Sequence, residues 1–485
     1  MRPETLPALP PTPMPEFRFN LSDFPVELLQ IIFSCCTETT DKHYTAPPWI
    51  AITHVCRHWR AIALDHHSLW TSITSQLHFC WAKAFMERSK PALVDVTIFS
   101  YATSSGSTPL SILDIVTLLS DCTRLRSLHI AGRPSHILEI LAILSPQTSI
   151  RTFCLIHRVL RPSAPLELPV SLFGGHAPIR EISFDSNTYI LAPHWLLRGI
   201  TRFECHQQIT LHALLDVMRE MPTLQHFELH SSFNHQPWKD TDAPQSPSIQ
   251  MPSLVCFSVH AHSLSFFMVL NQRLTLPKGV KRRLELLYQM ASDRDHWEAW
   301  IPPLLACVRA TDSLSHIQLS GGALDGWIRV WAGDVSATGY EDAEFSFSMN
   351  WSVYLCPRQL RGIFQTPIVH IASLCDLLGA TTTRRLILDA RPDDYDDYRD
   401  LSRSALWAFL SKLNAVEELE LCTDGVEVLR DAWKEDNAPA VLPALRKVRM
   451  VKVDNTAPSV STTTEEGLLR LLQGDGMRHT NLNLA

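Results

Sequence analysis

A short apolar motif recurs along the chain, and its spacing limits the folds that the chain can adopt. The motif has an apolar residue, two others, an apolar residue, one other and an apolar residue, as in LRSLHI at 125. Over the central part of the chain, successive copies begin 21 to 30 residues apart. Such a period is typical of repeat architectures, in which each unit packs against its neighbours. The copies begin at residues 93, 125, 150, 179, 200, 224, 254, 314, 383, 416 and 445.

Apolar quartets at i, i+3, i+4 and i+7 precede many of these motifs, and this spacing is that of one helix face. Two similar quartets, at Ile371 and Leu406, begin twelve and ten residues ahead of a motif. We therefore expect helices that alternate with parallel strands, each unit burying a helix face and a strand against its neighbours. Four quartets begin thirteen residues before the next motif, at Ile112, Ile137, Leu211 and Ile301.

The pattern resembles leucine-rich repeats, which implies an α/β solenoid with parallel strands. The family often has Asn three residues beyond the last apolar strand position, where its side chain bonds the backbone of the turn. This chain departs from that pattern, so we expect irregular units. The corresponding residues are Arg133, Arg158, Ser232 and Asp424.

Four regions are expected. Residues 1–17 form a disordered tail with six prolines, and residues 18–75 form a separate helical module. The repeat array spans 76–455, with insertions near 231–252 and 320–370. The first insertion is polar and proline-rich and predicts a mobile loop, whereas WIRVWAG and FSFSMNW in the second alternate like strands. Residues 456–485 are a C-terminal tail with a short helix.

The module at 18–75 begins with an amphipathic pattern. Leu28 and Ile32 are four residues apart, as are Leu29 and Phe33, so a helix following Pro25 would have one wide apolar face. A second helix is expected through WIAITHVCRHWRAIA, and a short third element ends at Trp70. The second helix would have one apolar face made of Ile52, Val55, Cys56, Trp59 and Ala63.

His54 and His58 in the second helix are four residues apart and could share a metal ion. No Glu lies in an H-E-x-x-H arrangement, and the local sequence positions no third ligand. We therefore expect no metal at these histidines, and no metal or cofactor was assigned to the chain.

The module resembles the F-box, a helical module that docks on the Skp-type adaptor of SCF cullin–RING ubiquitin ligases. Phe24 replaces the usual leucine, and the loop between the helices is longer than usual. Glu27, Arg57, Arg60 and Leu69 also match the family pattern. The resemblance implies adaptor contacts by Phe24, Pro25, Leu28, Leu29, Ile32, Phe33, Val55, Cys56, Trp59 and Trp70.

Charge and composition exclude several other functions. The net charge is −7 and the pI is near 6.3, so the broad basic field of a nucleic-acid-binding protein is absent. No uninterrupted apolar run approaches the ~18 residues of a membrane-spanning helix. The proline-rich start of the sequence does not resemble a signal peptide, and no C-x-x-C pair occurs among the twelve scattered cysteines. We therefore expect a reducing compartment, cytoplasmic and/or nuclear. No phosphate-loop, dinucleotide or serine-hydrolase motif occurs, so we expect no enzymatic activity.

The sequence thus predicts a non-catalytic substrate-recognition adaptor of an SCF-type ligase. The F-box would bind the Skp-type adaptor and, through it, the cullin scaffold, while the repeats would bind an unknown protein substrate. Strand residues between the apolar positions would form the reading surface, by which we mean the surface that binds the substrate. The alternative is a repeat-based interaction scaffold that recruits no ligase.

Overall fold

The computed structural model describes the N-terminal module and a series of strands that follow it. Predicted features at 1–17 and 456–485, most of the 231–252 insertion, and the quartets at Ile301, Ile371 and Leu406 lie outside the described residues. The described residues are 24–38, 47–100, 110–120, 122–144, 146, 148–157, 165–186, 190–207, 209–230, 248–261, 270–288, 314–321, 325–332, 345–352, 383–390, 410–422 and 442–451.

The N-terminal module is helical. It contains α1 (Val26–Glu38), a 3₁₀ helix η2 (Pro48–His54), α2 (Arg57–Asp65) and a second 3₁₀ helix η3 (His67–Trp70). Trp70 lies at the centre of its core, where its indole N–H donates to the carbonyl of Ala63 at 2.8 Å. This bond satisfies the indole donor, so the ring is buried without an unpaired polar atom.

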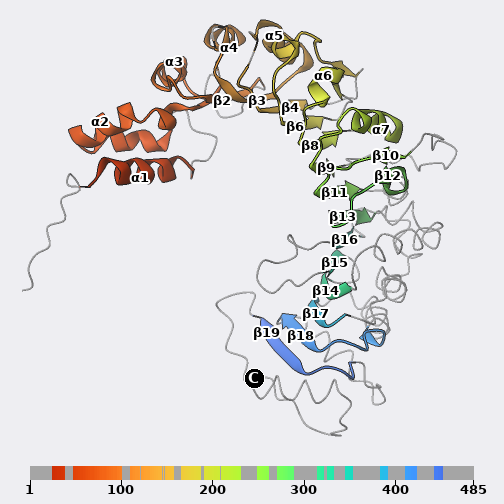
Figure 1. Cartoon of the computed structure of the whole chain (residues 1–485). Helices are drawn as coiled ribbons and strands as arrows, with labels where there is room; N and C mark the ends of the chain where they lie inside the picture. The colour runs from red at the N-terminus through yellow and green to blue at the C-terminus, as the bar shows by residue number, and fades with distance from the viewer. Residues whose placement is uncertain are drawn as a thin grey trace, which may run out of the picture.

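A fifteen-stranded open sheet follows the module and curves into an arc (Figure 1). Neighbouring strands are parallel except around β15, which is antiparallel to both β14 and β16. In order across the sheet the strands are β1 (Ser72–Thr74), β2 (Val94–Phe99), β3 (Leu125–Ala131), β4 (Thr152–His157), β6 (Glu181–Ser186), β8 (Arg202–Gln207), β9 (His226–His230), β11 (Cys256–Ala261), β13 (Lys281–Tyr288), β16 (Phe345–Ser352), β15 (Asp325–Ala332), β14 (Leu314–Gly321), β17 (Arg385–Ala390), β18 (Glu418–Cys422) and β19 (Lys447–Val451).

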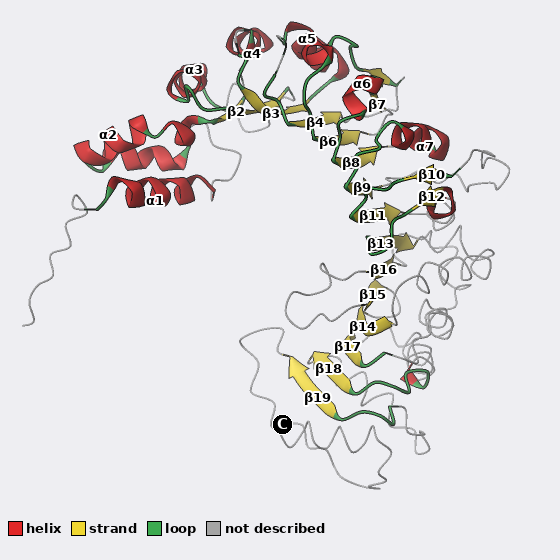
Figure 2. Ribbon diagram, viewed as in Figure 1, coloured by secondary structure: helices red, strands yellow, loops and turns green. Residues whose placement is uncertain are grey.

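Helices lie along the outer side of the arc and leave the inner side to the strands (Figure 2). Two short parallel pairs, β5 (Leu166–Glu167) with β7 (Ile190–Leu191) and β10 (Ile249–Gln250) with β12 (Leu274–Thr275), lie apart from the main sheet. We call the strand surface that faces away from the helices the inner face. The helical elements are α3 (Phe79–Arg88), α4 (Ile112–Leu119), α5 (Pro134–Ile143), η4 (Leu172–Gly175), α6 (His194–Leu197) and α7 (Leu211–Arg219).

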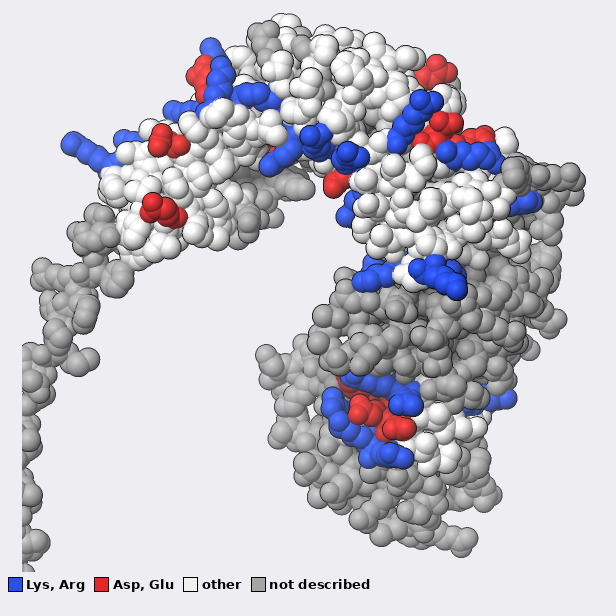
Figure 3. All heavy atoms as spheres, viewed as in Figure 1, with Lys and Arg blue, Asp and Glu red and all other residues white. Residues whose placement is uncertain are grey.

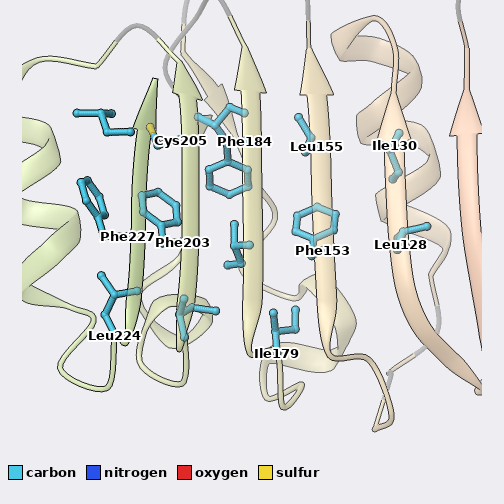
Figure 4. Close-up of a cluster of buried hydrophobic side chains, with 14 of the residues drawn as sticks. Leu128, Ile130, Phe153, Leu155, Ile179, Phe184, Phe203, Cys205, Leu224 and Phe227 are labelled. Atoms are coloured by element: carbon cyan, nitrogen blue, oxygen red, sulfur yellow. The ribbon is translucent and has the colours of Figure 1, made fainter. Parts of the chain in front are cut away.

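The core lies between the strands and these helices, and a ladder of phenylalanines forms its middle (Figure 4). Each of five neighbouring strands contributes one buried ring, with neighbouring centroids 5.5 to 6.4 Å apart. Successive side chains of a strand point to opposite faces, so the residues between the buried positions line the inner face. The ladder consists of Phe153, Phe184, Phe203, Phe227 and Phe257.

Many of the sequence predictions for this region are confirmed. Each of the eleven recurrent motifs overlaps a strand of the main sheet, and the quartets at Ile112, Ile137 and Leu211 lie in α4, α5 and α7. WIRVWAG and FSFSMNW form β15 and β16, so the insertion at 320–370 carries extra sheet.

Two expectations are corrected. The strand set is not uniformly parallel, because β15 and β16 form consecutive hairpins between β14 and β13. Strand β13 was also not predicted, although it continues the parallel series after β11. Its sequence, KRRLELLY, begins with three basic residues and breaks the motif that marks the other strands.

Candidate functional site

Helix α1 is apolar on two faces. Leu29 and Phe33 are buried in the module core, at 1% and 0% exposure. Leu28, Ile31 and Ile32 lie on the other side of the helix and are 44 to 60% exposed. An amphipathic helix of a globular protein normally presents polar residues to water, so an apolar outer row is typical of a surface that binds a partner.

The exposed row follows helical spacing and includes one thiol. Leu28, Ile31, Ile32 and Cys35 stand at i, i+3, i+4 and i+7, and all four are exposed. We call these residues the α1 outer row. Figure 3 shows few charged side chains over α1.

The predicted single second helix is wrong, because the chain breaks at Cys56. This residue is extended, with φ −156° and ψ 171°, and separates η2 from α2. Its sulfur accepts a hydrogen bond from the backbone N–H of Trp59 at 3.4 Å and so caps α2. The continuous apolar face from Ile52 to Ala63 is therefore divided, and Val55 and Cys56 are exposed at the break.

The break also separates the two histidines that the sequence places four residues apart. His54 ends η2, whereas His58 belongs to α2, and both side chains are exposed. The regular geometry that lets two histidines share an ion on one helix is therefore not formed here.

The structure divides the ten predicted adaptor-binding residues into three groups. Leu29, Phe33 and Trp70 are buried, so they support the core and their side chains offer no surface to a partner. Phe24 and Trp59 are partly buried against that core. The exposed members are Pro25, Leu28, Ile32, Val55 and Cys56.

Sequence reasoning missed three exposed apolar residues of the module. Ile31 is the most exposed of them, at 60%, and Val26 and Leu64 are also exposed. The signal for Ile31 was present, because it stands three residues after Leu28 and completes the helical row. The sequence prediction names only the two pairs four residues apart, Leu28 with Ile32 and Leu29 with Phe33, and so leaves Ile31 out.

A comparison with known protein families identifies this module. Residues 21–76 match the F-box-like family model. These residues form an F-box-like domain. The match covers the described helices α1, η2, α2 and η3 and the short strand β1. No protein of curated function matches the chain.

The F-box-like domain is joined tightly to the sheet that follows. The guanidinium of Arg124, which precedes β3, donates to the carbonyl of Met86 at 3.1 Å, to the hydroxyl of Ser89 at 3.3 Å and to the carbonyl of Ala92. Arg88 of α3 lies over the Trp70 ring, with its guanidinium carbon 4.4 Å from the ring centroid. These contacts tie the last turn of α3 to both the domain core and the sheet.

The inner face of the sheet is polar at the positions predicted to point outward. None of the motif residues predicted to point outward is buried. Several have partners on a neighbouring strand: Ser127 donates to Asp95 at 2.7 Å, and Arg126 forms an ion pair with the same carboxylate. The predicted residues are Arg126, Ser127, His129, Gln225, His226, Glu228, Glu417, Glu418 and Glu420.

Charges of both signs alternate over the end of the sheet. Glu418 is 3.4 Å from Lys447, and Glu420 is 2.5 Å from Arg385. Figure 3 shows acidic and basic side chains interleaved over β17–β19. Glu417, which precedes β18, and Glu418 and Glu420 of β18 are therefore part of a surface with charges of both signs and do not form a purely acidic patch.

Strands β8, β9 and β11 bring together histidines and glutamates, of which only Glu228 is among the residues predicted to point outward. Two overlapping groups form, Glu204 with His206 and His230, and Glu228 with His230 and His260. In each group the ligand atoms lie within 4.8 Å of one another.

Among the described residues, no helix combines the length and the apolar character that crossing a bilayer requires.

Proposed function

We propose that the chain is the substrate-recognition adaptor of an SCF-type cullin–RING E3 ubiquitin ligase. The F-box-like domain would bind a Skp-type adaptor and, through it, the cullin scaffold. One observation carries the proposal: a domain that matches this family holds an exposed apolar row on α1. An apolar row of this kind is stabilised when a partner removes it from water.

The exposed parts of the break between η2 and α2 would extend this surface. Val55, which is 55% exposed, and Cys56 are adjacent at the break. Leu29, Phe33 and Trp70 would act indirectly, because they hold α1 against the rest of the domain. Trp59 would do the same from α2, through its contact with Phe33.

We infer that the curved sheet is a degenerate leucine-rich-repeat solenoid and that its inner face binds the protein substrate. The recurrent motif, the helices on the outer side and the polar inner face support this assignment. The side chains of the inner face differ from strand to strand, which suits an irregular partner surface.

The proposed role needs no bond-making by this chain. It would raise the effective concentration of substrate lysines near a ubiquitin-charged enzyme held elsewhere in the complex. Burial raises the pKa of the Cys122 and Cys256 thiols, so these two cysteines are poor nucleophiles. The proposal also places the protein in the cytoplasm, the nucleus or both.

The alternative function is a repeat-based scaffold that binds proteins without recruiting a ligase. In this alternative the inner face still binds a protein partner, but no Skp-type adaptor binds the α1 outer row. Co-purification separates the two functions, because only the first requires a complex with a Skp-type adaptor.

The test uses the full chain and a purified Skp-type adaptor in size-exclusion chromatography. The proposal predicts co-elution as a stoichiometric complex, and addition of the cullin should enlarge it. Separate elution at micromolar concentrations of both proteins would contradict the ligase role and favour the scaffold.

A further inference from the structure

Three neighbouring strands repeat one short sequence at the same register. RFECH on β8, HFELH on β9 and CFSVH on β11 each place a phenylalanine three residues before a histidine. The phenylalanines belong to the core ladder, so the histidines lie on the opposite, inner face. Strand pairing sets Phe203 beside Phe227 and His230 beside His260, which brings the three histidines into one row.

The imidazole rings of this row are stacked. The rings of His206 and His230 have centroids 3.7 Å apart with 8° between their planes, and those of His230 and His260 are 4.0 Å apart at 7°. All three side chains are only 19 to 30% exposed. The row is thus partly shielded from water while remaining open to the inner face.

The Nε2 atoms of all three rings are directed toward the residues two positions earlier on the strands. His206 Nε2 is 2.6 Å from Glu204 Oε1, and His230 Nε2 is 2.8 Å from Glu228 Oε1. His260 Nε2 is 3.7 Å from the same Glu228 oxygen and 3.2 Å from Ser258 Oγ. Glu228 Oε1 therefore lies between two imidazole nitrogens.

A second carboxylate lies on the other side of the His260 ring. Glu285 on β13 is 2.7 Å from Nδ1 of His260, which leaves Nε2 of the same ring directed toward Glu228 and Ser258. A carboxylate on the far nitrogen is the arrangement that orients metal-binding histidines in proteins.

We propose that Glu228, His230 and His260 bind one divalent ion of the zinc class, with Glu285 as the carboxylate that orients His260. Imidazole and carboxylate are ligands of such ions, and three protein ligands leave a fourth position open to water or to a group on a bound partner. This proposal is independent of ligase recruitment, because the site lies on the sheet and not on the F-box-like domain.

The distances fit one ion after a small adjustment. Two ligands about 2.1 Å from an ion are at most about 4.2 Å apart. Both distances from Glu228 Oε1, 2.8 and 3.7 Å, already lie below this span, and the two Nε2 atoms lie within 4.8 Å. Because the rings of His230 and His260 are nearly parallel, binding of one ion would require them to tilt so that their Nε2 lone pairs meet at a common point.

The contacts of the histidine rings distinguish the two groups. The first group, Glu204 with His206 and His230, has no carboxylate comparable to Glu285 among the interactions seen for its rings, so we place the ion in the second group.

Zinc binding by the full chain tests the proposal. The chain is stripped with a chelator, dialysed and titrated with ZnCl₂ at pH 7.5 by calorimetry, with a weak competing chelator to suppress binding by the other histidines among the 22 in the sequence. One equivalent should bind, and Co²⁺ in its place should give the visible absorption of a four-coordinate site. Absence of a saturable equivalent would overturn the proposal.

Variants locate the ion. His260→Ala should abolish the equivalent, whereas His226→Ala, an exposed histidine of β9 outside the group, should retain it. Glu285→Gln should keep the stoichiometry and weaken affinity by ~10–100-fold. Full retention in His260→Ala, or loss in His206→Ala alone, would show that the ion is not held as proposed. Circular dichroism and Skp-type adaptor binding serve as controls for folding and for the separate ligase role.

Discussion

The rings of Phe33 and Trp59 pack with their centroids 5.2 Å apart and their planes at 60°, and this contact joins α1 to α2 across the domain core. Phe33 is fully buried, whereas Trp59 is only partly buried. Trp59 therefore spans the core and the surface, and its role in partner binding is inseparable from its role in holding α1.

Truncation of Trp59 should loosen the F-box-like domain. Trp59→Ala is expected to cost ~2 kcal/mol, less than the ~3–5 kcal/mol of a fully buried aromatic residue, because part of the ring is exposed. Hydrogen exchange measured by mass spectrometry should show faster exchange in α1 and α2. The affinity for the Skp-type adaptor should also fall. If neither the hydrogen-exchange protection of α1 and α2 nor the adaptor affinity changed, Trp59 would have no role in holding α1 or in adaptor binding.

Arg124 should matter much more than its neighbour Arg126. Arg124 donates to two carbonyls and a hydroxyl near the end of α3, so Arg124→Leu should destabilise the chain by ~2 kcal/mol. Arg126 makes an exposed ion pair with Asp95, and Arg126→Leu should cost no more than ~1 kcal/mol. Thermal unfolding of both variants gives the comparison, and equal shifts would contradict the bracing role of Arg124.

Acid should remove the stabilisation that Glu228 provides. The folded-state pKa of Glu228 is about 2, below its usual value of 4.5, so its contribution is present above pH 4.5 and is lost as the pH falls toward 2. Glu228→Gln should therefore lower the unfolding temperature of the metal-free chain at pH 7 and make a smaller difference at pH 3.5. Glu87→Gln, at an exposed position of α3, is the control. A difference that is constant across this range would contradict the assignment.

The ion pairs of β17–β19 change how the inner face should be tested. Reversing Glu417, Glu418 and Glu420 together would break three existing ion pairs and place like charges beside Arg446, Lys447 and Arg385, so a loss of substrate capture could come from local misfolding. Exchanging Arg385 and Glu420 keeps their pair and inverts its direction. We expect the exchange to preserve folding and adaptor binding and to reduce capture of a substrate that uses this end. An unchanged pull-down of an identified substrate would exclude this pair from the reading surface.

The sequence predicts the strands well because their signal is local. The apolar side chains of the motifs, such as Leu125, Leu128 and Ile130, are fully buried in the core between the strands and the helices. The same spacing recurs in the other motifs. The predicted second helix failed because apolar periodicity continues through Cys56 while the backbone there is extended. The spacing of apolar residues shows which side chains can share a face. It does not show a break in the helical backbone when the apolar spacing continues across that break.

The histidine row depends on register, which local spacing does not show. His206, His230 and His260 are 24 and 30 residues apart, and parallel pairing alone makes them neighbours. Alignment of the motifs would have revealed the row, because each histidine directly follows its motif. The division of α1 into a buried and an exposed row is different, since both rows are apolar and only the packing of Leu29 and Phe33 decides which one faces inward.

Affinity of the full chain for a Skp-type adaptor, with the α1 outer row altered, tests the central claim most directly. Leu28→Asp with Ile31→Asp changes two exposed side chains and leaves the core intact, and Leu113→Asp on α4, which is 73% exposed, is the matched control. We predict that the double variant keeps its circular dichroism spectrum and loses adaptor affinity by at least about 30-fold, while the control binds as the unmodified chain does. Equal adaptor affinity in the double variant and the control would contradict the account.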